Sequence, residues 1–216
     1  MEQHKILIIG AGGITSYLLP CLTKTSKPNQ VVIYDGDNLE RRNLRRQASF
    51  NDLDVNNNKA QILGEKFGTN YVPEFFHENN CQHKPKYILC CADNNAARVS
   101  AQIYAQRHNS TLIIGANEYE SAEAYAWHTK TGLPKPTKFY PELLEADDSP
   151  EQALGCDHQE TIKQHEQLPI ANMVAASFML ALFHTIKNLP DIRELAYIKN
   201  HHLSNLLSTN SQSWNT

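Results

Sequence analysis

KILIIGAGGIT, residues 5–15, decides the fold of this chain. Its apolar run, 6–9, is typical of a parallel strand that is buried on both faces. A Gly-rich turn follows at 10–13, and residues 16–22 (SYLLPCL) have the spacing of a helix. Such a turn lets the backbone approach a phosphate, and the helix N-terminus offers free N–H groups and a positive dipole end. The stretch therefore predicts a nucleotide-binding strand–turn–helix unit.

A second apolar run, 31–34 (VVIY), ends at Asp35, about where such a unit places the acid that holds a ribose. The glycine pattern is incomplete, because Thr15 stands at the third glycine of G-x-G-x-x-G, which normally permits close helix–strand packing. The turn alone therefore leaves dinucleotide and mononucleotide binding equally open.

Five segments, in this order, narrow the choice: GAGGIT at 10–15, YDGDNLE at 34–40, NLRRQ at 43–47, NNNKA at 56–60, and CADN at 91–94 with Arg98. Together they resemble the ThiF/MoeB/HesA superfamily, the adenylating enzymes related to ubiquitin-activating enzyme. The match covers roughly the first half of the chain and is weaker in the second. There, the segment that begins QLPIAN is similar to stand-alone bacterial ThiF-like proteins such as those of the PRTRC mobile-element systems.

The resemblance implies ATP and Mg²⁺ as cofactors. It places Gly10 against the phosphates, Asp35 on the ribose hydroxyls and Asp93 beside the magnesium ion as its protein ligand. The whole implied nucleotide-binding set is Gly10, Gly12, Gly13, Asp35, Asp37, Asn43, Arg46, Gln47, Lys59, Asp93 and Asn94. The implied catalytic residues are Arg46, Lys59, Asp93 and Cys156.

The chemistry of Arg46 and Lys59 suits a triphosphate. ATP carries about four negative charges, and its α-phosphate gains more in the transition state. A planar guanidinium and a compact ammonium answer that charge. Asp93 follows the apolar run 87–92, and open α/β sheets bind ligands at the carboxyl ends of their strands. Taken singly, each cation is typical of a solvated surface; taken in this order, they indicate a site.

Cys156 lies beside Asp157 and His158 in a segment rich in Pro, acidic residues and His. Relatives place there a cysteine that accepts the activated partner. A thiolate becomes nucleophilic when a nearby cation lowers its pKa, as His158 or His165 could do. A loop cysteine without function stays open as the alternative. One cysteine and two histidines match no closed zinc pattern, and the Cys-x-x-Cys pairs of many relatives are missing, so we predict no metal cage.

Composition and charge limit the function classes. The net charge of −3 gives no basic footprint for nucleic acid. Five cysteines without a regular framework point to the cytoplasm. The first strand follows directly on residues 1–4, so we expect no signal peptide. In relatives, an arginine upstream of the first strand reaches the partner subunit's ATP. Because the strand begins so early here, we expect that arginine to be missing. Either Arg45 replaces it or adenylation is inefficient.

The remaining pattern predicts one Rossmann-like α/β domain over 1–207, with a mostly parallel sheet, helices on both faces and antiparallel strands added in the C-terminal half. A polar tail, 208–216, follows. We expect a crossover loop at about 133–167 that passes over the nucleotide site, as the family places one there. Further expected elements are helices at 59–67 and 94–108, an edge strand at 71–76, strands at 111–116 and 122–130, and terminal strands at 194–199 and 203–207. Cys21, Cys90 and Cys91 are expected in the core.

Residues 168–187 form the most apolar segment, and a membrane span is the first alternative to weigh. Asn172, Ser177 and His184 interrupt it, and Pro169 shortens it below about twenty residues, so a buried helix is the better interpretation.

The resulting hypothesis is an ATP-dependent adenylyltransferase that activates a carboxylate. The expected partner is a small ubiquitin-like or sulfur-carrier protein, and we expect a homodimer without nucleic-acid or membrane partners. Two alternatives remain: a non-catalytic nucleotide-binding protein, and an NAD-dependent oxidoreductase, in which NLRRQ has no evident role.

Overall fold

The computed structural model describes residues 5–117, 121–145, 168–198 and 202–206. A seven-stranded sheet in the order β3-β2-β1-β4-β5-β6-β7 forms its centre. The strands are β1 (Ile6–Ile9), β2 (Val31–Tyr34), β3 (Asn70–Val72), β4 (Tyr87–Cys90), β5 (Thr111–Asn117), β6 (Ser121–Trp127) and β7 (His202–Leu206). The first five are parallel, and β6 and β7 are antiparallel additions, as the sequence predicted.

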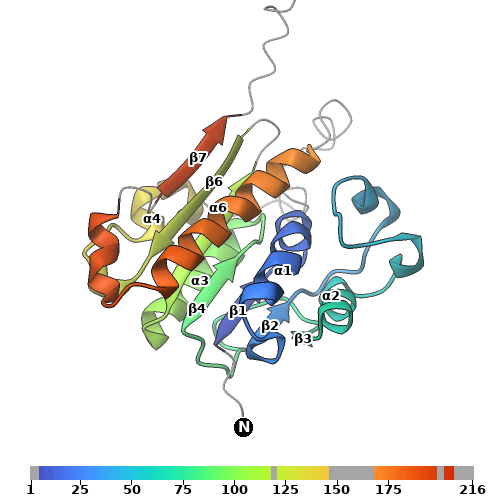
Figure 1. The fold of residues 1–216 in the computed structure, drawn as a ribbon, viewed down its shortest axis with the longest axis horizontal. Coiled ribbons are helices and arrows are strands. Elements are labelled where there is room, and N and C mark those ends of the chain that lie inside the picture. The colour runs from blue at the N-terminus through green and yellow to red at the C-terminus, as the bar shows by residue number, and fades with distance from the viewer. Residues whose placement is uncertain (1–4, 118–120, 146–167, 199–201, 207–216) are drawn as a thin grey trace, which may run out of the picture.

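Helices cover both faces of the sheet. In Figure 1, α1 (Gly13–Thr25), α2 (Lys59–Phe67) and α6 (Pro169–Lys187) lie in front, and α3 (Asn95–His108) and α4 (Pro136–Phe139) lie behind. Short 3-10 turns join them: η1 (Pro28–Gln30), η2 (Arg41–Arg45), η3 (Asp52–Asp54), η4 (Thr129–Thr131), η5 (Pro141–Leu144) and η7 (Ile192–Tyr197). The helices predicted at 59–67 and 94–108 are confirmed, and Gly68 and Asn109 end them in the left-handed conformation.

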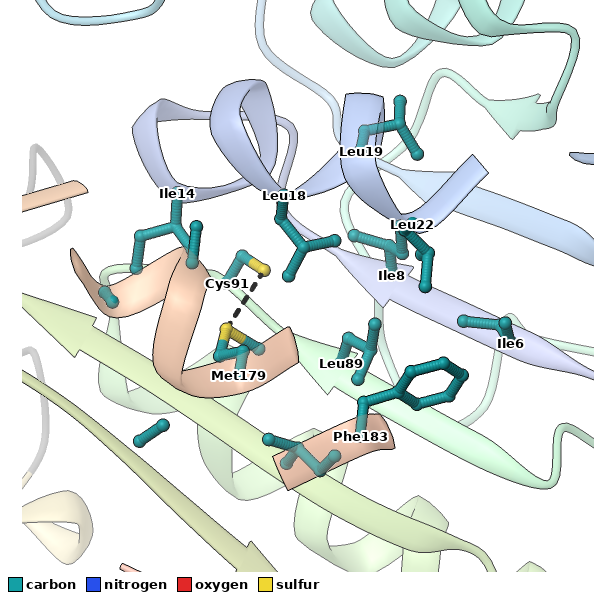
Figure 2. Packing of buried hydrophobic residues seen from close by; sticks show 14 of the residues in the cluster. Ile6, Ile8, Ile14, Leu18, Leu19, Leu22, Leu89, Cys91, Met179 and Phe183 are labelled. Atoms are coloured by element: carbon teal, nitrogen blue, oxygen red, sulfur yellow. Dashed lines mark hydrogen bonds between the residues drawn. The ribbon is translucent and has the colours of Figure 1, made fainter. Parts of the chain in front are cut away.

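Alternate strand residues supply two cores. Ile6 and Ile8 pack with the front helices, whereas Leu7 and Ile9 pack with α3. Figure 2 shows the front core, where the Cys91 and Met179 sulfurs are 3.8 Å apart. Cys90 and Cys91 are buried on opposite faces, as expected from their adjacency, and burial raises both thiol pKa values, to about 11 and about 12. Cys21, in contrast, is exposed on the outer side of α1.

Three expected elements need correction. The edge strand at 71–76 is only Asn70–Val72, because Pro73 has no N–H for a ladder. The segment 194–199 is not a strand: 192–197 form η7, which Asp191 caps by accepting the Arg193 N–H at 2.9 Å. Of the expected crossover loop, 133–145 contain α4 and η5, and η5 contacts α3. Residues 146–167 lie outside the described residues. The expected passage of the loop over the nucleotide site falls on that segment and stays a prediction.

Helix α6 is the helix of the described residues that is long and apolar enough to cross a membrane, by length and composition only. Its residues Ala175, Met179, Leu182 and Phe183 are buried, and it packs against α1, β5 and β6. This arrangement agrees with the buried helix expected from the sequence.

Candidate functional site

A pocket of about 510 Å³ lies at the carboxyl edge of the sheet, in the size range of small-molecule sites. The chain leaves β1 for β2 on one side and returns to β4 on the other, so the strand order reverses here. Open α/β sheets bind their ligands at such a reversal. The strands end level with one another, because Ile9 pairs with both Tyr34 and Cys90. Every residue of the predicted nucleotide-binding set lines this pocket: Gly10, Gly12, Gly13, Asp35, Asp37, Asn43, Arg46, Gln47, Lys59, Asp93 and Asn94.

The Gly-rich turn needs glycine at its first position. Gly10 has φ +90°, and a Cβ there would lie 3.0 Å from the backbone nitrogen of Ala92 at the end of β4. Thr15, the departure from the glycine pattern, is fully buried, and its hydroxyl donates to the Gly10 carbonyl at 2.6 Å. This hydrogen bond stabilises the Gly-rich turn, so the threonine does not disrupt it.

Asp35 is held rigidly at the end of β2. Its carboxylate accepts the backbone N–H of Ala11 at 2.6 Å and that of Asp37 at 2.7 Å, and only 7% of the residue is exposed. Burial raises the pKa of this carboxyl, against the lowering effects of Lys59 and the two N–H donors. A buried acceptor beside the Gly-rich turn is suited to ligand hydroxyls.

Lys59 enters the pocket from the first position of α2. Its Nζ lies 3.1 Å from a carboxylate oxygen of Asp37, and its side chain is 11% exposed. Asn58 caps α2 by accepting the Gln61 N–H, and its amide donates to the carbonyls of Asp35 and Asp37. This one side chain therefore fixes the start of α2 to the turn after β2.

The segment that follows Arg46 is hydrogen-bonded to α1, because Pro20 leaves one carbonyl of that helix without its usual partner. Proline has no N–H, so the Ser16 carbonyl lacks its intrahelical partner and accepts the Ser49 hydroxyl at 2.5 Å. The Ser16 hydroxyl oxygen in turn accepts the Ala48 N–H at 3.1 Å. The Arg46 side chain forms no ion pair within the described residues. Its guanidinium is therefore available to an anion.

Asp93 lies exposed in the turn between β4 and α3. Arg98 braces this turn by donating from Nε to the Ala92 carbonyl at 3.1 Å. Asn94 caps α3, its side-chain oxygen accepting the Ala97 N–H at 2.8 Å, so its contribution to a ligand is limited to its amide donors. Among the described residues, no group of three or more His, Cys, Asp or Glu is placed to hold a metal ion.

Sequence reasoning missed several lining residues. Phe75 is 65% exposed, and its ring lies so close to Gly36 that a Cβ there would be 2.7 Å away. The other missed lining residues include Arg42, Phe76, His77, Ser100, Asn117 and Asn172. Pro73, which directly follows β3, is a sequence signal that the strand ends there and the chain turns toward the pocket. Arg45, proposed as a substitute arginine, does not line the pocket, and Cys156 lies outside the described residues.

The fold and pocket define a doubly wound α/β protein with a ligand site at its topological switch point. The ThiF family model matches residues 1–215, and the chain belongs to the ThiF family.

One curated relative is the NEDD8-activating enzyme E1 catalytic subunit of Saccharomyces cerevisiae. It is 42% identical over 67 residues, which are 31% of this chain and 22% of the relative. Among solved structures, E. coli MccB has 17% identity and a TM-score of 0.64, over 94% of this chain and 59% of that one. E. coli MccB with ATP has 19% identity and a TM-score of 0.61, over 83% and 55%. The chain spans less than two thirds of the length of each of these proteins.

Proposed function

We propose that this protein is an ATP-dependent adenylyltransferase that activates the carboxylate of a protein or peptide. One observation carries the proposal: the buried acceptor Asp35, the cations Lys59 and Arg46, and the acid Asp93 all line a single pocket at the switch point. A hydroxyl acceptor, two cations and a metal-binding acid match, in order, a ribose, a triphosphate and magnesium. Family membership and the structural similarity to MccB, solved with ATP, support this assignment.

The order of the strand ends supports one direction for the proposed nucleotide. Asp35 follows β2 and would accept the ribose hydroxyls, and Phe75 beyond it offers an apolar surface for the base. The phosphates would extend past Gly10 toward the turn after β4. Mg²⁺ neutralises phosphate charge, and it is held chiefly by phosphate oxygens and water with one or two carboxylates. The carboxylate of Asp93, which lines the pocket, would supply such a ligand.

In the reaction, an oxygen of the acceptor carboxylate attacks the α-phosphorus of ATP. A bond forms between them, the bond from the α-phosphorus to the bridging oxygen breaks, and pyrophosphate leaves with that electron pair. Arg46 and Lys59 would stabilise the charge that develops on the phosphate oxygens. The protein otherwise contributes position, because the turn around Gly10 and the cap at Asn58 are set before the ligand arrives.

A small ubiquitin-like or sulfur-carrier protein remains our proposed acceptor, supported by the E1 relative and by MccB, which was solved with MccA derivatives.

Dimerisation through the flank of the sheet also remains a proposal. A mass near the 24.5 kDa of the monomer, measured by light scattering at micromolar concentration, would contradict it.

Cys156 is predicted to act, if at all, after adenylation, so Cys156→Ala should retain pyrophosphate exchange and lose any thiol-sensitive conjugate. Loss of exchange in a folded variant would assign Cys156 to the first step.

The test of the proposal is exchange of labelled pyrophosphate into ATP, driven by a small protein that ends in Gly-Gly and is recovered by pull-down. The expected result is exchange that needs both Mg²⁺ and the free carboxyl terminus. Tight ATP binding without exchange, when the recovered partner is present, would identify a non-catalytic nucleotide-binding protein.

A further inference from the structure

Three side-chain amides that line the pocket each have one buried polar atom without a hydrogen-bond partner. They are Oε1 of Gln47, Nδ2 of Asn117 and Nδ2 of Asn172, each of which is inaccessible and forms no hydrogen bond. Only 1% of Asn172 and 4% of Gln47 are exposed. Buried polar groups in native proteins are almost always paired, so three such atoms around one pocket point to a ligand that completes them.

The fold brings Asn117 and Asn172 to the same edge of the sheet. The Met179 side chain on α6 lies against Gly115 of β5, since a Cβ there would be 2.3 Å from its sulfur. Asn172 precedes Met179 by about two helical turns, on the same face of α6. Asn117 follows Gly115 by two residues, on the same face of β5. Both amides line the pocket, and the Asn172 amide reaches so far that a Cβ at Gly13 would be 2.1 Å from its oxygen.

Their position relative to the nucleotide is set by strand order. Asp35 follows β2, and Asn117 ends β5, with β1 and β4 between them. A ribose on Asp35 and phosphates along Gly10 therefore leave the β5–α6 end of the pocket for the second reactant. A small rotation about the last side-chain torsion, which is soft in asparagine, turns either NH₂ group toward a bound oxygen.

We propose that Asn117 and Asn172 bind the acceptor's terminal carboxylate, one amide donor to each of its oxygens. Gln47, whose amide lies beside Gly12 of the Gly-rich turn, stays with the proposed nucleotide site. Neutral amides orient the carboxylate without the strong ion pair that an arginine or lysine would form, so the attacking oxygen stays more nucleophilic. This inference rests on the proposed function and adds the two residues that position the acceptor's carboxylate.

The test measures binding of dye-labelled random hexapeptides with free carboxyl ends, and of the same pool amidated, in the presence of a non-hydrolysable ATP analogue. Fluorescence anisotropy reports the peptides, and calorimetry reports the analogue. Wild-type protein should bind the free acids at least about tenfold more tightly than the amides. Asn172→Leu and Asn117→Leu should each remove most of that preference. Asn188→Leu is the matched control, because Asn188 caps the other end of α6, outside the pocket.

The outcomes separate this inference from the proposed function. If wild type binds the analogue without preferring free acids, or if folded Asn172→Leu keeps the preference, the carboxylate site is wrong and the nucleotide assignment stands. If folded Asn172→Leu loses the analogue as strongly as the peptide, Asn172 belongs to the nucleotide site and the inference is overturned. If wild type does not bind the analogue, the proposed function itself fails. Thermal melting of each variant identifies those that are folded.

Discussion

The two ends of the pocket differ in how their polar groups are satisfied. At the β2 end, Asp35 accepts two backbone N–H groups, and Asn58 and Lys59 bond to the turn that carries Asp37. At the β5–α6 end, the amides of Asn117 and Asn172 each retain an unpartnered donor. A preformed end binds its ligand with little reorganisation, whereas an unsatisfied end gains its hydrogen bonds only when a ligand arrives. Under the proposed function, we therefore expect the nucleotide to bind first and the acceptor second.

The largest expected effect is on the chemical step. Arg46→Ala and Asp93→Ala should each lower pyrophosphate exchange by at least about 100-fold. The first removes a cation that would stabilise the charge on the phosphate oxygens, and the second removes the carboxylate proposed to hold Mg²⁺. Both residues are partly or fully exposed, so melting temperatures should hardly change. Arg41→Ala is the matched control: Arg41 lies in η2, which ends next to Arg46, but it pairs with Asp52 outside the pocket. Unchanged exchange in Asp93→Ala would remove Asp93 from the site.

Gly13→Ala should destabilise the fold by about 2 kcal/mol, because the added methyl overlaps the amide of Asn172. In an Asn172→Ala background the same change should cost much less, so a double-mutant cycle in urea measures the contact directly. Gly12→Ala is the control, since the nearest atom to its new Cβ is 3.9 Å away, and it should stay within about 0.5 kcal/mol. Additive costs in the cycle would show that Asn172 does not occupy this position.

Ser49→Ala should cost about 1 to 2 kcal/mol, because it leaves the Ser16 carbonyl without a partner beside Pro20. The same change should weaken ATP binding a few fold, since the 47–49 segment then holds Arg46 less firmly. Pro20→Ala tests the cause: it restores an N–H for the Ser16 carbonyl, and Ser49→Ala should then cost less. Equal costs in both backgrounds would disprove this explanation.

The smallest effect concerns Asp35 and pH. Burial raises its pKa in the folded chain above the unfolded value. The contribution of the group to stability is therefore fully present below the unfolded pKa and is lost as pH rises through the raised pKa. Urea unfolding of wild type and Asp35→Asn should diverge accordingly, the variant gaining relative stability as pH increases. A difference that is constant with pH would mean that the pKa is not raised.

Much of the fold could be predicted because local signals agreed. The runs at 6–9 and 87–90 read as buried parallel strands, and Gly68 and Asn94 ended or capped helices at the expected residues. The strand expected at 194–199 was wrong because apolar alternation outweighed a cap from Asp191 that only the structure displays. Short apolar runs do not distinguish strands from 3-10 turns by pattern alone.

The residues of the proposed nucleotide site could be predicted from motifs, and those of the proposed acceptor site could not. Gly10, Asp35 and Lys59 lie in segments whose order carries information. Asn117 and Asn172 are isolated amides, far apart in sequence, which line the same pocket because α6 packs across β5. No spacing rule marks such a pair; the unpartnered Nδ2 atoms are visible only after the helix has been placed.

The central claim is that the pocket at the β1–β4 reversal binds a triphosphate with magnesium. Titration calorimetry of the full chain with ATP and Mg²⁺, and separately with NAD, tests it most directly. The account predicts saturable, Mg²⁺-dependent binding of ATP, weakened by Lys59→Ala, and no binding of NAD. Binding of NAD without binding of ATP would contradict it.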